Sequence, residues 1–234
     1  MPHTFLERPR LLNLAAETGS RQSHFFWESL NAAVYLIGGG IFIAGSFFFF
    51  PTLEEYQDTG CLLFFLGSLL YLVVTGHDMA EVWARRYEAR GGFGQRLGEI
   101  VSAFAYLSGT VLFTVGSVFF SSLLDWGLLG AWTFIIGSAC FVAGAMINVL
   151  QIVRAGSMAK LVLLNLTAVS FLVGSVLFTV ASIPYLWHFA APEDGAILYG
   201  FLAWQYLVGS ALFLAGGLFN YMRAVLVLRG GRAG

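Results

Sequence analysis

Polar side chains recur at matched positions near one end of three apolar segments. Counted from the glycines at 67, 137 and 209, position plus eleven carries a carboxylate or an amide, and position plus fourteen carries a carboxylate, an amide or a guanidinium. Lys160, near the start of another segment, is expected at the same depth. We define the predicted polar layer by these residues: Asp78, Glu81, Asn148, Gln151, Lys160, Asn220 and Arg223.

Two kinds of chemistry fit the polar layer. In the first, its groups hydrogen-bond and form ion pairs between helices and thereby close one end of a bundle. In the second, they line a vestibule or bind a small polar solute or a lipid headgroup, as ionisable groups inside membranes often do. The residue types leave both open. The expected ion pairs join Asp78 or Glu81 to Lys160 or Arg223.

The other ionisable residues do not indicate catalysis. His77 precedes Asp78, but adjacent side chains on a helix point about 100° apart, so the two do not form a chelate. Glu28 and Glu99 occupy matching first-turn positions, where a carboxylate interacts favourably with the helix dipole. We find no metal-ligand spacing, nucleophile elbow or phosphate-binding loop. We therefore expect a non-enzyme with no catalytic residue, no metal and no cofactor.

The elements that must position the polar layer are membrane-spanning helices. The chain is 58% hydrophobic and only 11% charged, whereas charged residues make up about a quarter of soluble domains. Six apolar runs each reach the about 20 residues that cross a hydrocarbon core. They are expected to be helices, because a chain in lipid must satisfy its own backbone hydrogen bonds. The predicted spans are 29–50, 60–82, 98–121, 126–152, 159–183 and 195–222.

One short sequence pattern occurs in every predicted span. An aromatic residue, two further residues, Gly-Ser, two more residues and a second aromatic fall on a single stripe of a helix. Small residues at such positions let helix backbones approach closely, and the flanking rings cover the hollow. The predicted packing positions are Gly45, Ser46, Gly67, Ser68, Gly116, Ser117, Gly137, Ser138, Gly174, Ser175, Gly209 and Ser210.

The spacing of these glycines indicates an internal repeat of helical hairpins. They pair as 45 with 67, 116 with 137 and 174 with 209, and corresponding glycines recur at about 70 residues, with a shorter step from 116 to 174. In this register Lys160 matches Asn31 and Ser102, and Leu164 matches two tyrosines, at 35 and 106. We predict an all-α membrane protein whose three hairpins have pseudo-threefold symmetry along the membrane normal.

The charges predict the orientation of the spans. All Lys and Arg residues lie in the N-terminal segment, between spans two and three, between spans four and five, or after span six, while the opposite loops carry only acidic charges. By the positive-inside rule, both termini are cytoplasmic. Residues 1–27 are expected to form a cytoplasmic segment, in which Leu11 to Ala15 form an interfacial amphipathic helix or part of a partly ordered tail. Residues 229–234 are a cytoplasmic tail.

Two stretches resemble a known family. Residues 41–46 (Ile-Phe-Ile-Ala-Gly-Ser) and 63–68 (Leu-Phe-Phe-Leu-Gly-Ser) are similar to the bacterial YrhK-like membrane domain, which recurs about three times over residues 30 to 225. The expected repeats are 28–95, 96–156 and 157–228. The resemblance implies a small integral domain of the bacterial cytoplasmic membrane and carries over no catalytic or ligand-binding residue.

Packing residues outnumber chemical ones, so the first functional hypothesis is a non-catalytic accessory, assembly or scaffold subunit. Its expected partners are membrane lipids and other integral membrane proteins, and the near-neutral net charge of −1 gives no indication of nucleic acid. The alternative is a channel or transporter for an ion or small solute along the pseudo-threefold axis. A path there needs a hydrophobic gate, because the outer half of the stripe is uncharged.

Overall fold

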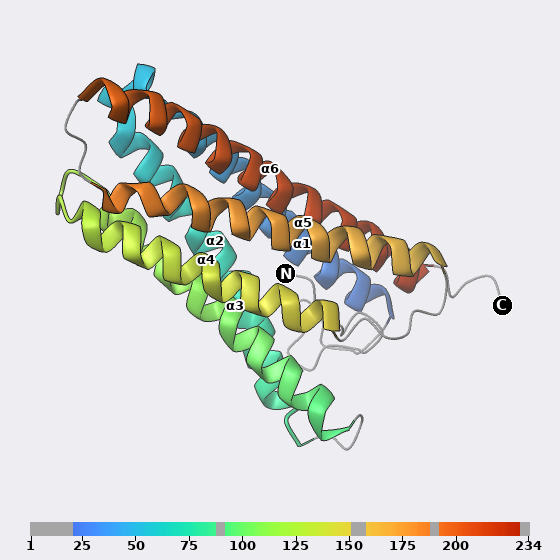
Figure 1. Cartoon of the computed structure of the whole chain (residues 1–234). Helices are drawn as coiled ribbons and strands as arrows, with labels where there is room; N and C mark the ends of the chain where they lie inside the picture. Colours follow the sequence, from blue (N-terminus) through green and yellow to red (C-terminus); the bar gives the residue numbers. More distant parts are fainter. Residues whose placement is uncertain (1–20, 88–91, 151–157, 188–191, 230–234) are drawn as a thin grey trace.

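The computed structural model describes residues 21–87, 92–150, 158–187 and 192–229. Six α-helices account for most of them (Figure 1), and short 3-10 turns follow α1 and α5. The elements are α1 (Arg21–Phe47), η2 (Pro51–Tyr56), α2 (Gln57–Ala84), α3 (Phe93–Phe119), α4 (Gly127–Leu150), α5 (Met158–Ser182), η3 (Ile183–Leu186) and α6 (Pro192–Arg229).

Several helices extend beyond the predicted spans at one end or both, whereas α4 lies within its predicted span. α1 begins at Arg21 rather than at 29, so residues 21–27, predicted to belong to an N-terminal segment, are helical. No Gly or Pro interrupts the chain between Arg21 and Ile37, so the helix continues past the apolar run that the prediction followed. α6 starts at Pro192, a favoured first helical residue, and runs to Arg229. The amphipathic helix predicted at 11–15 lies outside the described residues.

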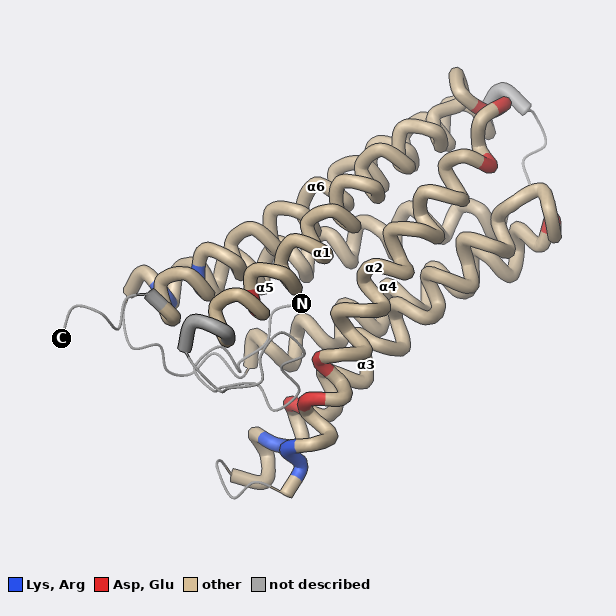
Figure 2. The backbone as a smooth tube through the Cα atoms, turned by 180° about the vertical axis from the view of Figure 1, so that it is seen from behind, with Lys and Arg blue, Asp and Glu red and all other residues tan. Residues whose placement is uncertain are grey.

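All six helices are long and apolar enough to cross a membrane, with mean hydropathy between 1.6 and 2.3 in their best windows. Their outward faces are apolar as well: Val73 is 64% exposed, Phe104 60% and Phe201 62%. In Figure 2, charged residues lie at the two ends of the bundle and the tube between them is uncharged. The protein is therefore a multi-pass membrane protein.

The helices form a closed ring in chain order. Each packs against its neighbours in sequence, and α6 returns to pack against α1 (Figure 1). Inside the ring each helix contributes two buried aromatic side chains. Their rings meet across the axis: Phe64 lies 6.2 Å from Phe178, and Phe113 lies 5.5 Å from Phe178, measured between centroids. The twelve are Tyr35, Phe42, Phe64, Tyr71, Tyr106, Phe113, Phe134, Phe141, Phe171, Phe178, Tyr206 and Phe213.

Within each hairpin a ring from the first helix covers a glycine of the second helix. A Cβ placed on Gly67 would lie 3.1 Å from the Phe42 ring, one on Gly137 2.9 Å from the Phe113 ring, and one on Gly209 2.8 Å from the Phe178 ring. The same glycine Cβ positions lie 3.1 to 3.2 Å from backbone oxygens of Gly38, Gly109 and Gly174. Only glycine allows the two backbones this approach.

These contacts differ from the predicted register in the third hairpin. Gly174 faces Gly209 as Gly109 faces Gly137, so it corresponds to Gly109 and not to Gly116. The residue that matches Gly116 is Ala181, 65 residues later, and both are buried. The predicted register of α5 is wrong by seven residues. Aromatic and small residues repeat every two turns in this helix, so the two registers look alike in sequence.

The new register changes which residues match. Thr167, not Lys160, corresponds to Ser102, and Lys160 lies about two turns nearer the helix end. Phe171, not Leu164, corresponds to Tyr106. The third hairpin therefore carries an aromatic ring at this level as the other two do, but one without a hydroxyl group.

Candidate functional site

The candidate site lies at the end of the bundle where α1, α3 and α5 begin and α2, α4 and α6 end. Among the described members of the predicted polar layer, Asp78, Glu81, Asn148 and Arg223 are all less than 10% exposed. Gln151 lies outside the described residues. The helices thus do bury polar groups at this end, and the three hairpins satisfy them in different ways.

In the second hairpin the polar group is held by a phenol. The Asn148 side-chain nitrogen donates a hydrogen bond of 3.1 Å to the Tyr106 hydroxyl, and both residues are buried. Tyr106 reaches this position because its ring lies over Gly144, where a Cβ would come within 3.2 Å of ring carbons. A buried amide needs such a partner, since an unpaired polar group in an apolar interior is costly.

In the first hairpin the corresponding tyrosine takes another direction. Val74 stands where the second hairpin has Gly144, so the ring of Tyr35 lacks the hollow that receives Tyr106. Tyr35 instead stacks on Tyr71 with centroids 4.3 Å apart, and its hydroxyl donates a 3.4 Å hydrogen bond to the backbone oxygen of Phe213. It also packs against Gly217 of α6.

In the third hairpin the amide faces a ring without a hydroxyl group. Phe171 lies over Gly216, where a Cβ would come within 2.9 Å of ring carbons. Because Phe171 offers no hydrogen bond, Asn220 differs from Asn148 in its partners. Its side-chain oxygen accepts a 3.1 Å hydrogen bond from the Arg223 guanidinium, one turn further along α6.

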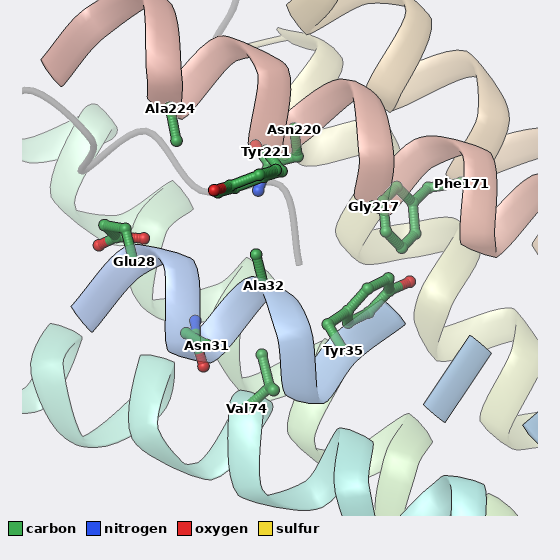
Figure 3. Close-up of a pocket in the computed structure, with 10 residues that line it drawn as sticks. All are labelled: Glu28, Asn31, Ala32, Tyr35, Val74, Phe171, Gly217, Asn220, Tyr221 and Ala224. Carbon is green, nitrogen blue, oxygen red and sulfur yellow. The ribbon is translucent and has the colours of Figure 1, made fainter. Parts of the chain in front are cut away.

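Tyr35 of the first hairpin and Phe171 of the third, which differ from Tyr106 in the way just described, both line one cavity. It has a volume of about 20 Å³ and lies between α1, α2, α5 and α6. Figure 3 shows Glu28, Asn31 and Tyr35 of α1 on one side of it and Asn220 and Tyr221 of α6 on the other. The Tyr221 hydroxyl lies 3.2 Å from the hydroxyl of Ser29. The floor is apolar, and the complete lining is Glu28, Asn31, Ala32, Tyr35, Val74, Phe171, Gly217, Asn220, Tyr221 and Ala224.

The size of the cavity limits what it holds. A cavity needs roughly 10–15 Å³ to hold one water molecule, so this one accommodates a single water among its carboxylate, amide and phenol groups. A second cavity of about 10 Å³ lies on the axis between the aromatic rings and is at or below that limit. Its lining is mainly aromatic and also includes Ser68, Tyr71 and Thr110.

The buried charges include a pair that sequence reasoning missed. The Nε of Arg85, the C-cap residue of α2, lies 2.5 Å from Glu81 Oε1, and the two side chains are 8% and 1% exposed. Extending the stripe of α2 by one more turn past Glu81 reaches Arg85, so the signal was available in the sequence. The pairing of Asp78 or Glu81 with Lys160 or Arg223 stays a prediction.

Two further residues of α1, His24 and Trp27, also lie at this end of the bundle. His24 is 7% exposed, and neither of its ring nitrogens has a hydrogen-bond partner among the described residues. It precedes Glu28 by one turn, so it lies on the same buried face. The ring of Trp27 lies 4.8 Å from that of His77, which places His77 beside α1.

Metal ligation has no visible support in the part of the chain that the structure describes. There, no three His, Cys, Asp or Glu side chains converge as a metal site requires. Cys61 and Cys140 are both free thiols.

Comparison with known proteins places the first four helices in a family. The family model described as YrhK-like protein matches residues 26–82 and 96–153, that is, the α1–α2 and α3–α4 hairpins in tandem. Three copies were expected, and the model matches two; the third hairpin shares their glycine contacts but not the match. No curated protein and no solved structure matches the chain.

Proposed function

The chain is a six-helix membrane protein that carries two YrhK-like domains in tandem. We propose that it is a non-catalytic accessory or scaffold subunit that packs against other membrane proteins and lipids. The observation that carries this proposal is the filled interior. Aromatic rings occupy the axis, and each of the two cavities described above leaves room for about one water at most. The apolar faces exposed on all six helices are then the surfaces available for contacts.

The proposed arrangement is three hairpins about a pseudo-threefold axis along the membrane normal. The reciprocal approach of Gly38 with Gly67, of Gly109 with Gly137 and of Gly174 with Gly209 supports it, since one geometry recurs in three hairpins. The closed order of the helix contacts supports it further. The polar end then lies on the axis and closes the bundle on that side.

The proposed location is the bacterial cytoplasmic membrane, with both termini in the cytoplasm. Among the described residues, basic side chains occur only at the end where α2 and α4 finish, whereas acidic ones occur at both ends (Figure 2). Basic flanks are retained on the cytoplasmic side during insertion. Fusion of a reporter that is active only in the periplasm tests this topology: activity at position 123, in the α3–α4 loop, and none at the C-terminus is expected.

Capture of the native complex tests the accessory role. The full chain, expressed from its own promoter with a C-terminal tag, is extracted in a mild detergent or polymer and analysed for co-purifying membrane proteins. We expect a defined partner at constant stoichiometry. The matched variants are Val73→Ala and Phe104→Ala on outward faces, because they change the contact surface and leave the core intact. Recovery of the chain alone under all extraction conditions contradicts the proposal.

Transport is the second candidate, favoured by the polar cavity at the basic end. A conducting state requires the rings on the axis to part, so basal flux should be low and should rise when Phe178→Ala opens the axis. Proteoliposomes loaded with a pH- or potassium-sensitive dye measure this. Saturable flux of an ion or solute in the unmodified protein, abolished by Asp78→Ala with Asn148→Ala, would favour transport over the accessory role.

A further inference from the structure

Arg86 lies just beyond the end of α2 in a setting different from that of its neighbour Arg85. Arg85 turns back to pair with the buried Glu81. The Arg86 guanidinium carbon instead lies 4.6 Å from the ring centroid of Trp83 and 4.4 Å from that of Tyr87. One of its nitrogens donates a 2.6 Å hydrogen bond to the backbone oxygen of Trp83. Two rings and one carbonyl therefore hold a single guanidinium in place.

This arrangement leaves donors for a ligand. A guanidinium has five N–H donors in a fixed plane, and the Trp83 carbonyl takes one of them. Aromatic faces attract the cation without using its N–H groups. The remaining edge of the guanidinium suits two oxygens of a phosphate, which arginine binds in a bidentate manner.

The surroundings indicate where the ligand comes from. Trp83 is 54% exposed and Tyr87 is 81% exposed, at the end of a membrane-spanning helix. Tryptophan and tyrosine at such positions lie at the level of lipid headgroups. A guanidinium held beside them is thus at the depth of lipid phosphates, and Figure 2 shows the basic residues gathered at this end of α2 and α3.

A second arginine reaches the same level from α3. Val82 and Met79 of α2 pack with Ala103 and Ile100 of α3. Because the helices are antiparallel, continuing by one turn past Val82 on α2 and past Ile100 on α3 leads to Arg86 and Arg96. The Arg96 Nε has no hydrogen-bond partner among the described residues. Two positive charges at one level favour an anion between the chain and the membrane surface.

We propose that Arg86, held by Trp83 and Tyr87 and assisted by Arg96, binds the phosphate of an anionic phospholipid. This inference deepens the lipid partnership of the proposed function. The lipid contact itself requires only that the helices cross a membrane, whereas assignment to the inner leaflet rests on the proposed topology.

The test is lipid titration of the purified full chain, followed by native mass spectrometry, with phosphatidylglycerol and phosphatidylcholine in parallel. We expect phosphatidylglycerol to bind more tightly. Arg86→Gln should weaken its binding about fivefold, because one basic side chain near an anionic membrane contributes roughly that factor. Arg86→Lys keeps the charge but loses the planar donor edge, and Tyr87→Leu keeps the arginine but removes one ring, so both should bind with intermediate affinity.

Circular dichroism and size-exclusion profiles identical to wild type establish that the variants are folded. Equal affinity of wild type and Arg86→Gln for phosphatidylglycerol, or equal affinity of wild type for the two lipids, overturns the proposal. Equal affinity of Arg86→Lys and wild type for phosphatidylglycerol would show that charge attraction alone accounts for binding, and it also overturns the proposal. These results are separate from capture of a protein partner, so either proposal can fail alone.

Discussion

Phe42 of α1 lies against Gly67 of α2 so closely that a Cβ on the glycine would stand 3.1 Å from two ring carbons and 3.2 Å from the backbone oxygen of Gly38. The same relation joins Phe113 to Gly137 and Phe178 to Gly209. The same contact between an aromatic ring and a glycine thus recurs in three separate hairpins. The energetic consequences of this contact, and of the places where the hairpins depart from one another, can be measured.

Gly137→Ala is expected to destabilise the protein by about 1–3 kcal/mol, the usual cost of overpacking. The added Cβ meets the Phe113 ring at 2.9 Å and the Gly109 backbone oxygen at 3.1 Å, and backbone cannot move aside as a side chain can. Gly40→Ala is the matched control, since a Cβ there has no neighbour within 4 Å. Thermal unfolding in detergent compares the two. Equal loss of stability in both variants would contradict the packing account.

Tyr106→Phe should remove the hydrogen bond between Tyr106 and Asn148. Hydrogen bonds between helices in membranes contribute about 0.6 kcal/mol on average and about 1.7 at most, so the loss should fall in that range. A double-mutant cycle with Asn148→Ala isolates the interaction. A coupling free energy of zero would show that the amide is satisfied by other groups.

Phe171→Tyr should have the opposite effect, because it supplies a hydroxyl group at the position where Tyr106 stands in the second hairpin. The new hydroxyl enters the 20 Å³ cavity beside Asn220 and takes the space of one water. We expect stability to be unchanged or raised by up to about 1 kcal/mol. Phe178→Tyr, which places a hydroxyl among aromatic rings, should be destabilising by comparison. Similar losses in both variants would refute the proposed equivalence.

Asp58→Asn tests the link between the first two hairpins at the acidic end. The Asp58 carboxylate accepts a 2.8 Å hydrogen bond from the Ser122 backbone nitrogen and another from the Ser122 hydroxyl. With the charge removed, the loop between α3 and α4 should open more often, because bonds to a charged acceptor are the stronger kind. Faster hydrogen exchange at Ser122, with unchanged exchange in α5, is the expected result. Glu54→Gln nearby serves as the control.

Arg85→Gln should destabilise the protein more than the double variant Glu81→Gln with Arg85→Gln. Removal of one partner leaves the Glu81 carboxylate, which is 1% exposed, without the guanidinium that lies 2.5 Å away. Breaking a buried pair costs more than replacing both members by neutral groups. Chemical unfolding in mixed micelles measures the order of the three proteins. A double variant less stable than Arg85→Gln would reverse this account.

The sequence alone determined the membrane location, the six helices and the face that each helix buries, because apolar length and small-residue spacing act within a single helix. It also predicted that polar groups such as Asp78 and Asn148 gather at one end, since their positions follow from the same stripe. The tertiary structure decided how the stripes meet. In α5 the aromatic and small residues repeat every seven positions, so Gly116 could be matched to Gly174 or to Ala181, and only contact with α6 distinguishes the two. The cavity was likewise invisible in sequence, because it depends on Val74, Gly217 and Phe171, which come from three different helices and meet only when the ring closes.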